Sequence, residues 1–171
     1  MSIDQEYFNM GKWLGDKLHY HKISYYNSIK RKQVLQGEVW KCDLGCNIGE
    51  EKNKKRPVLV ISNNFISRTG KVIVACITDA DGKIKAGSHV PIYDSWCLLY
   101  ANTTDNAKMF RIGRTVPRNN IPYSFLDKDS VVQCEELKAV SKARLSINKL
   151  GDIAPTDLIK IKNRLKIVFD I

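Results

Sequence analysis

The sequence predicts a mainly β protein with helices, an α+β fold in which a small, mostly antiparallel barrel carries a C-terminal helix. Three observations predict it. Short apolar or alternating runs follow one another closely from residue 37 onward, as in strands joined by turns. The beginning and the end of the chain show helical periodicity instead. The chain has 171 residues, 43% apolar and 27% charged, which fits one folded domain with additions and excludes disorder of the whole chain.

Residues 1–36 are expected to form a helical extension. Apolar side chains recur there at steps of three and four residues and form one stripe: Tyr7, Met10, Leu14, Leu18, Tyr25 and Ile29. Gly11 and Gly15 each weaken such a helix by about 1 kcal/mol relative to alanine. We expect the aromatic stripe to pack on the rest of the chain, on a second subunit or on a partner.

The barrel domain is expected over residues 37–171. Six segments have the length and composition of strands: 40–44, 57–62, 72–78, 89–93, 130–137 and 139–145. The last helix begins near Pro155, since proline suits a first helical turn. Its apolar stripe consists of Leu158, Ile161, Leu165 and Val168.

An insertion at about residues 93–128 interrupts this domain. It is rich in turn residues and aromatic side chains, and a loop of this length is usually functional or partly structured. Arg111, Arg114 and Arg118 alternate there with Phe110 and Tyr123, a mixture that suits single-stranded nucleic acid. The alternative is an insertion that packs on the barrel.

The charge balance points to a polyanionic partner. Lys and Arg number 28 against 18 Asp and Glu, so the net charge is +10. Nucleic acid is the leading candidate for such a chain, and improved solubility is the alternative role of the excess. The basic residues are spread along the chain, which excludes a basic tail.

Cysteine usage suggests a reducing, cytoplasmic location. The five cysteines include no C-x-x-C pair, so neither a disulfide framework nor a zinc site is expected. Cys76 and Cys134 lie in apolar runs and are expected in the core. No run approaches the roughly 18 apolar residues of a membrane span, and no signal-peptide pattern opens the chain. No metal or cofactor is expected.

The segment of residues 37–62 is the strongest candidate for chemistry. A strand leads into a polar loop that returns at Arg56-Pro57, where a buried strand begins. A guanidinium at such a strand start suits bidentate phosphate binding and the stabilisation of transition-state charge. The alternative is a local ion pair between Arg56 and Glu50 or Glu51.

Three lysines beside this arginine form a basic rim on the loop: Lys52, Lys54 and Lys55. Such a rim would steer RNA toward Arg56 by its charge. A run of charges is also typical of a solvated surface, and this alternative stays open.

Five blocks of the sequence follow one another in the order and register of a known family. They are Gly49-Glu50-Glu51-Lys52 continued by 56–63 (RPVLVISN), 72–78 (VIVACIT), 88–92 (SHVPI), 129–137 with 141–145, and Leu150-Gly151 with the terminal helix. On these residues the chain resembles the MazF/PemK toxins of bacterial toxin–antitoxin systems. The resemblance leaves residues 1–36 and most of 93–128 outside it.

The resemblance implies a small SH3-like, CcdB-type barrel with a C-terminal helix, to which residues 1–36 add an N-terminal helix. It implies a growth-inhibiting toxin that cleaves single-stranded RNA, such as mRNA, without metal. The ribose 2′-hydroxyl would attack the adjacent phosphorus and leave a cyclic phosphate and a free 5′-hydroxyl. The implied partners are a second copy of the chain, in a homodimer, and a cognate antitoxin.

The resemblance also implies the site residues. The family's catalytic arginine and threonine correspond to Arg56 and Thr78. Arg56 would stabilise the phosphate and take part in proton transfer, while the Thr78 hydroxyl would hold a phosphate oxygen. A glutamine and an arginine of the family are replaced here by Glu136 and Lys138, which we expect among the RNA contacts.

Two other functions remain open from the sequence. The related CcdB toxins share the barrel and bind DNA gyrase without cutting RNA, and an inactive regulator that binds nucleic acid could use the same fold. The pair of Arg56 and Thr78 favours cleavage. His89 matches a family position that we interpret as structural.

Overall fold

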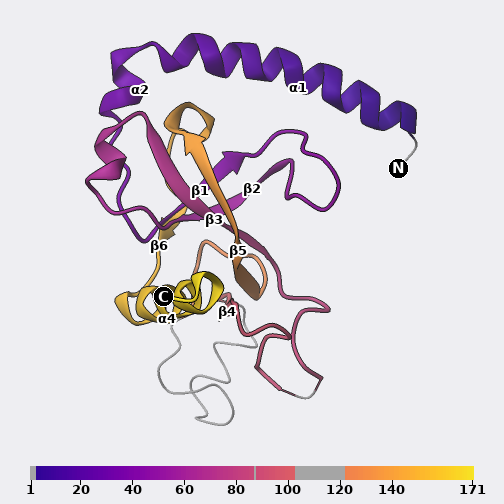
Figure 1. Cartoon of the computed structure of the whole chain (residues 1–171), viewed down its shortest axis with the longest axis vertical. Coiled ribbons are helices and arrows are strands. Elements are labelled where there is room, and N and C mark those ends of the chain that lie inside the picture. Colours follow the sequence, from indigo (N-terminus) through magenta and orange to yellow (C-terminus); the bar gives the residue numbers. More distant parts are fainter. Residues whose placement is uncertain (1–2, 87, 103–121) are drawn as a thin grey trace.

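The computed structural model of the chain describes residues 3–86, 88–102 and 122–171. In these residues the chain forms one six-stranded antiparallel sheet in the order β4-β5-β3-β2-β1-β6 (Figure 1). The strands are β1 (Glu38–Asp43), β2 (Lys55–Val60), β3 (Lys71–Asp79), β4 (Trp96–Leu99), β5 (Ser130–Ser141) and β6 (Gly151–Asp152). The helices are α1 (Ile3–Ser24), α2 (Asn27–Arg31) and α4 (Pro155–Phe169), with 3-10 turns η1 (Ile66–Arg68) and η2 (Lys142–Arg144). The predicted α+β class is confirmed.

The central strands are buried on both faces. Leu59 of β2 and Ile77 of β3 lie in the apolar cluster that Ile161 of α4 completes. Their chain neighbours Val58 and Cys76 point to the opposite face and lie in a second cluster. Because successive side chains of a strand alternate between faces, burial of both faces requires the continuous apolar runs seen in the sequence.

Helix α4 covers one face of the sheet, and its start is held by a buried tyrosine. The hydroxyl of Tyr123 donates to Asp157 Oδ2 at 2.6 Å and accepts from the backbone N–H of Ala154 at 2.9 Å. Ala154 is the N-cap, and Pro155 opens the first turn as expected. These bonds join residue 123 to the final helix.

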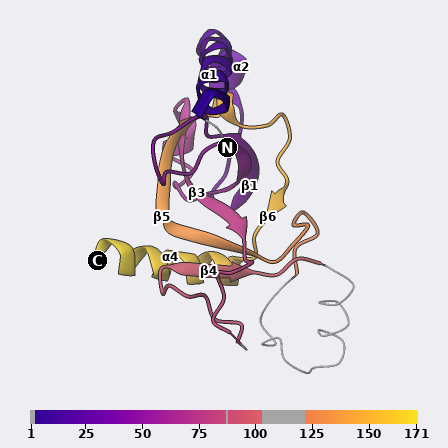
Figure 2. The same ribbon diagram turned by 90° about the vertical axis from the view of Figure 1, so that its right-hand side faces the viewer.

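Helix α1 lies at the opposite end of the sheet from α4 in both ribbon views (Figures 1 and 2). Three contacts attach its inner face to the barrel. The hydroxyl of Tyr20 donates to Asp43 Oδ2 at 3.0 Å, and the Arg144 guanidinium lies 5.0 Å from the centre of the Trp13 ring. The Cys46 thiol contacts the backbone oxygen of Asn9 at 3.5 Å.

The apolar stripe expected in the first 36 residues is present in α1 but does not pack on the barrel. Tyr7, Leu14 and Leu18 are all exposed, and no residue of α1 is buried. The sequence left three surfaces open on which the stripe could pack: the rest of the chain, a second subunit or a partner. The first is excluded for the part of the chain that the structure describes, because the stripe is exposed there.

Two strand predictions are wrong. Residues 89–93 form no strand, only an isolated bridge between Ile84 and Pro91, because the turns around them leave no partner for a longer ladder. Residues 139–145 are no separate strand, because β5 continues unbroken to Ser141 and then turns into η2. The short strands β4 and β6 escaped prediction, and β4 lies within residues 93–128.

The cysteines agree with the sequence analysis. All five are free thiols, and Cys76 and Cys134 are fully buried, which confirms their prediction as core residues. Within the described ranges, no helix is both long and apolar enough to cross a bilayer.

Gly45 is expected to be essential for the seating of α1. Its φ of +83° is a conformation that side chains disfavour, and a Cβ atom there would overlap the Trp13 indole. We expect Gly45→Ala to lower the free energy of unfolding by about 1–3 kcal/mol and to speed hydrogen exchange in α1. Urea unfolding and amide exchange would measure both.

Gly49→Ala is the matched control for this prediction, since Gly49 has a φ of +60° but no atom near its Cβ position. It should show the cost of the backbone conformation without the change in α1. Equal exchange in the two variants would contradict a role for Gly45 in seating Trp13.

Candidate active site

Arg56 begins the apolar part of β2, where the sheet opens toward solvent. Its Cα pairs with Cys42 of β1, and its side chain is half-buried. The Nε group donates to the backbone oxygen of Asn53 at 2.9 Å, which fixes the root of the guanidinium. No ion pair joins Arg56 to Glu50 or Glu51 in the described part of the chain, so the expected alternative of a local pair is not realised there.

Thr78 lies near the end of β3, beside the start of β2 that carries Arg56. The β2–β3 ladder pairs Val58 with Cys76, and continuing the same antiparallel register by two residues would bring Arg56 across from Thr78. Residues two apart on a strand share a face, so both side chains lie on the face of Val58 and Cys76. The ladder ends at the pair of Val58 and Cys76, so Arg56 and Thr78 each lie two residues beyond its end.

Four charged side chains act on the Cys76 thiol, which marks the floor of this site. Burial is the largest influence and raises the pKa of the thiol to about 11. Glu136 raises this pKa as well, whereas Arg56, Lys138 and Lys52 lower it. The thiol stays neutral, and its pKa is influenced by three cations and one carboxylate. We call these four charged residues the Cys76 cluster.

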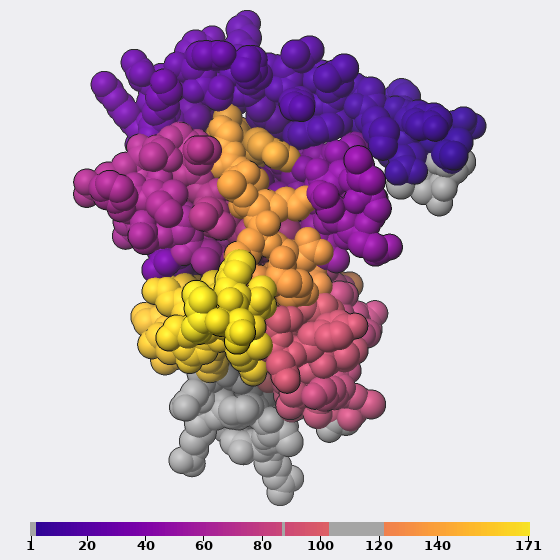
Figure 3. Space-filling view, in the orientation of Figure 1, coloured from indigo at the N-terminus to yellow at the C-terminus, as the bar shows by residue number. Residues whose placement is uncertain are grey.

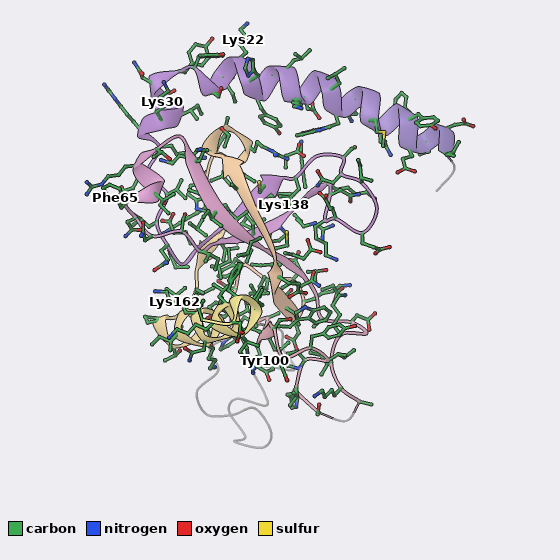
Figure 4. The ribbon with its side chains drawn as sticks, viewed as in Figure 1. Lys22, Lys30, Phe65, Tyr100, Lys138 and Lys162 are labelled. Atoms are coloured by element: carbon green, nitrogen blue, oxygen red, sulfur yellow. The ribbon has the colours of Figure 1, made fainter. Side chains whose placement is uncertain are left out.

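The loop between β1 and β2 is joined to β5 by Lys138 (Figure 4). Its ammonium group lies 3.0 Å from Glu51 Oε2 and donates to the backbone oxygen of Lys52 at 3.2 Å. Glu51 is largely exposed, so the ion pair itself stabilises the fold by less than about 1 kcal/mol. Its effect is on position, because it keeps two members of the Cys76 cluster, Lys52 and Lys138, next to each other.

A bulge in β5 decides which charge faces the site. Cys76 pairs with Gln133, but the next residue of β3, Ala75, pairs with Leu137. Without this shift of three residues Glu135 would face the site, whereas the bulge brings Lys138 there. The Glu135 carboxylate instead accepts a hydrogen bond from the Trp96 indole.

Lys54 and Lys55 do not belong to the Cys76 cluster. They are exposed and line a cavity of about 580 Å³ between α1 and the β1–β2 loop, which Trp13 also lines. Lys55 lies 3.7 Å from Asp43 Oδ2. Of the predicted basic rim, the structure therefore brings only Lys52 to the cluster.

The other predicted residues either lie apart from the cluster or fall outside the residues that the structure describes. Arg111 and Arg114 fall outside the described residues, as does Arg118. His89 is exposed, and its ring lies 6.1 Å from that of Tyr100, in a different cavity that α4 also lines. Within the described ranges no group of three or more His, Cys, Asp or Glu side chains is arranged to hold a metal ion.

Gln133 is the residue that the sequence analysis missed. It is only 4% exposed, pairs with Cys76 on one side and Trp96 on the other, and shares their face of the sheet. Its Oε1 atom has no hydrogen-bond partner among the described residues. The sequence feature that could have revealed it is a single amide side chain inside the apolar run of residues 131–134. A buried acceptor without a partner costs about 1–3 kcal/mol of stability.

Comparison with protein families gives a match to most of the chain. Residues 35–121 and 110–169 match the model of a family described as PemK-like, MazF-like toxin of type II toxin–antitoxin system. The chain is 30% identical over 135 residues to endoribonuclease MazF of Staphylococcus epidermidis, covering 78% of this chain and 89% of that protein. It is 25% identical over 144 residues to endoribonuclease MazF9 of Mycobacterium tuberculosis, covering 81% and 98%.

Solved structures share the fold at low sequence identity. MazF (Form-I) from Deinococcus radiodurans superposes with a TM-score of 0.53 at 16% identity, over 81% of this chain and 97% of that one. An endoribonuclease in complex with its cognate antitoxin, from a mycobacterial species, gives a TM-score of 0.52 at 20% identity, over 81% and 96%. These likenesses support the predicted α+β fold, in which the expected small barrel takes the form of a curled antiparallel half-barrel with helices.

Replacing the unpartnered amide should stabilise the protein. We expect Gln133→Leu to raise the free energy of unfolding by about 1 kcal/mol, because an apolar side chain leaves no buried acceptor unpaired. Urea unfolding would measure it.

The matched control is Gln36→Leu, which removes an amide that donates to the backbone oxygen of Ile61 at 2.6 Å. It should lower the same free energy. A loss of stability in Gln133→Leu would show that its amide has a partner and would refute our interpretation.

Proposed function

Because this chain belongs to the PemK-like, MazF-like toxins of type II toxin–antitoxin systems, a family represented among its relatives by endoribonucleases, we propose that it cleaves single-stranded RNA with Arg56 and Thr78. The observation that carries this proposal is the Cys76 cluster. Three cations and one carboxylate influence the Cys76 thiol, which lies two residues before Thr78 on β3. Two of these cations also lie side by side, since the Lys138 ammonium group donates to the backbone oxygen of Lys52. Such an excess of positive charge suits a phosphodiester.

The proposed reaction is attack of a ribose 2′-hydroxyl on the adjacent phosphorus. The bond from O2′ to phosphorus forms, the bond from phosphorus to O5′ breaks, and the products are a 2′,3′-cyclic phosphate and a 5′-hydroxyl. One proton leaves O2′ and one reaches O5′, so atoms and charge balance. No redox step or metal enters this scheme.

Each residue of the pair has a separate role in the proposal. Arg56 donates hydrogen bonds to the nonbridging oxygens as negative charge develops, and takes part in the proton transfer. The hydrogen bond from its Nε to Asn53 leaves the terminal amino groups for the phosphate. Thr78 donates its hydroxyl to a phosphate oxygen. Lys52 and Lys138 attract the RNA strand by their charge, and Glu136 makes a polar contact with the RNA.

The proposal extends to partners and location. We propose that the chain acts as a homodimer in the cytoplasm and is neutralised by a cognate antitoxin. Supporting this, a solved structure with the same fold is an endoribonuclease held by its antitoxin. The rival readings, a CcdB-like toxin without nuclease activity and an inactive nucleic-acid-binding regulator, do not need the pair of Arg56 and Thr78.

Loss of Arg56 should abolish cleavage without unfolding the protein. We expect Arg56→Ala to lower kcat/KM on single-stranded RNA by about 100- to 1,000-fold, because one group that stabilises transition-state charge is lost. Cleavage in EDTA, with mass spectrometry of the cyclic-phosphate end, would measure it.

Arg68→Ala is the matched control, because Arg68 is exposed at the end of η1 and its removal changes the net charge equally. It should cleave within twofold of the wild type. If the folded wild type leaves varied RNAs intact in EDTA while Arg56→Ala remains toxic to cells, the nuclease proposal fails.

Thr78 allows a test of its hydroxyl alone. Thr78→Val has nearly the same shape, so we expect at least a tenfold loss of kcat/KM with little change in stability. Thr78→Ser keeps the hydroxyl and should retain most activity. Equal rates for the two variants would remove Thr78 from the mechanism.

A further inference from the structure

Helix α1 presents an apolar face to solvent along its whole length. Five large side chains on it are between 59% and 68% exposed: Ile3, Tyr7, Phe8, Leu14 and Leu18. A space-filling view shows the helix as a ridge along one end of the molecule (Figure 3). An exposed apolar face of this extent on a folded protein marks an interaction surface.

The direction of this face is fixed by the contacts on the other side of the helix. Trp13 packs against Arg144 and Gly45, and Tyr20 donates to Asp43. Trp13 and Tyr20 are seven positions apart, which is about two turns of the helix, so they define one side of it. Tyr7 and Phe8 point away from that side. Leu14 and Leu18 lie at the edge of the outer face, because they also border a hollow of about 350 Å³ lined by Trp13, Tyr20 and Arg144.

The first and last turns of α1 carry charges of opposite sign. Asp4 and Glu6 lie in the first turn, whereas His21 and Lys22 lie in the last. An antiparallel copy of the same helix would therefore bring each acidic end against a basic end. The two helix dipoles would also oppose one another favourably. A parallel pair would instead set like charges together.

The spacing of the residues fits an antiparallel pair centred on Trp13. In such a pair, residues whose numbers add up to 26 lie at the same height. Asp4 then meets the partner's Lys22, Phe8 meets the partner's Leu18, and Gly11 meets the partner's Gly15. A Cβ atom at either glycine would have no neighbour within 4 Å in the free protein. In the pair, the two glycines let the backbones approach closely at the centre.

We propose that the outer face of α1 binds the outer face of α1 in a second copy of this chain, in antiparallel orientation. A two-fold axis beside the middle of the helix pairs the acidic end of each copy with the basic end of the other. Such a contact is isologous, because both copies use the same residues. The helix is about 33 Å long, so the contact runs across one whole end of the molecule. This contact is additional to the homodimer proposed above, and it is separate from RNA cleavage, which the Cys76 cluster carries.

Charge reversal tests the orientation directly. Asp4→Lys and Lys22→Asp should each raise the dissociation constant of the self-association at least tenfold, measured by sedimentation of the full chain over a range of concentrations. The variant with both changes exchanges the two charges and should return to within threefold of the wild type. Lys162→Asp, on exposed α4 at the other end of the molecule, is the control and should leave the constant unchanged (Figure 4).

Apolar substitutions test the surface itself. Leu14→Asp should halve the mass of the assembly, whereas Ile159→Asp should not, because Ile159 is also 59% exposed but lies on α4, at the other end of the molecule. Gly11→Leu should also weaken the association, although leucine favours a helix more than glycine does. Circular dichroism and RNA cleavage of these variants should match the wild type, which separates this proposal from the proposed nuclease function.

Three results would overturn the proposal. The first is a wild type and a Leu14→Asp variant of equal mass at every concentration. The second is a double charge-reversal variant as weak as the single ones, which excludes the antiparallel pairing. The third is a Leu14→Asp variant that keeps its mass but loses binding to the antitoxin, which would make the antitoxin the occupant of this face.

Discussion

The burial of both faces of the central strands is the constraint on which the rest of the structure depends. Val58 and Leu59, or Cys76 and Ile77, are neighbours in the chain that enter opposite apolar clusters. Charged groups cannot be placed in the middle of such strands without a large desolvation cost. In β2 and β3 the polar residues are therefore confined to the strand ends. Because the strands are antiparallel, the start of β2 lies beside the end of β3, and their polar residues meet.

The bulge in β5 adds charge selection to this arrangement. A shift of three residues is odd, so it exchanges the side chains that face the site with those that face away. Lys138, in place of Glu135, pairs with Val74, so the bulge adds a cation to the cluster and not a carboxylate. The same lysine contacts Glu51 and the backbone of Lys52. One irregularity of the backbone thus sets both the sign of the site and the position of the loop beside it.

The β1–β2 loop is held from two sides by parts of the chain that are distant in sequence. Trp13 of α1 packs on Gly45 at its start, and Lys138 of β5 binds Glu51 near its end. The loop leads directly into Arg56. Helix α1 therefore does two things in the structure: its inner face restrains this loop, and its outer face stays exposed.

The sequence by itself determined the four longer strands and the terminal helix, because burial on each face imposes a local pattern of apolar residues. It gave Arg56 and Thr78 as candidates only through the resemblance to the toxin family. It left out β4 and β6, whose few residues carry no periodicity, and it missed Gln133, whose importance lies in the missing partner of a buried atom. Only the tertiary structure decided that Lys52, but not Lys54, reaches the site, and that the stripe of α1 points outward. Periodicity shows that a face is apolar, whereas what covers it depends on register and on contacts between segments far apart in the chain.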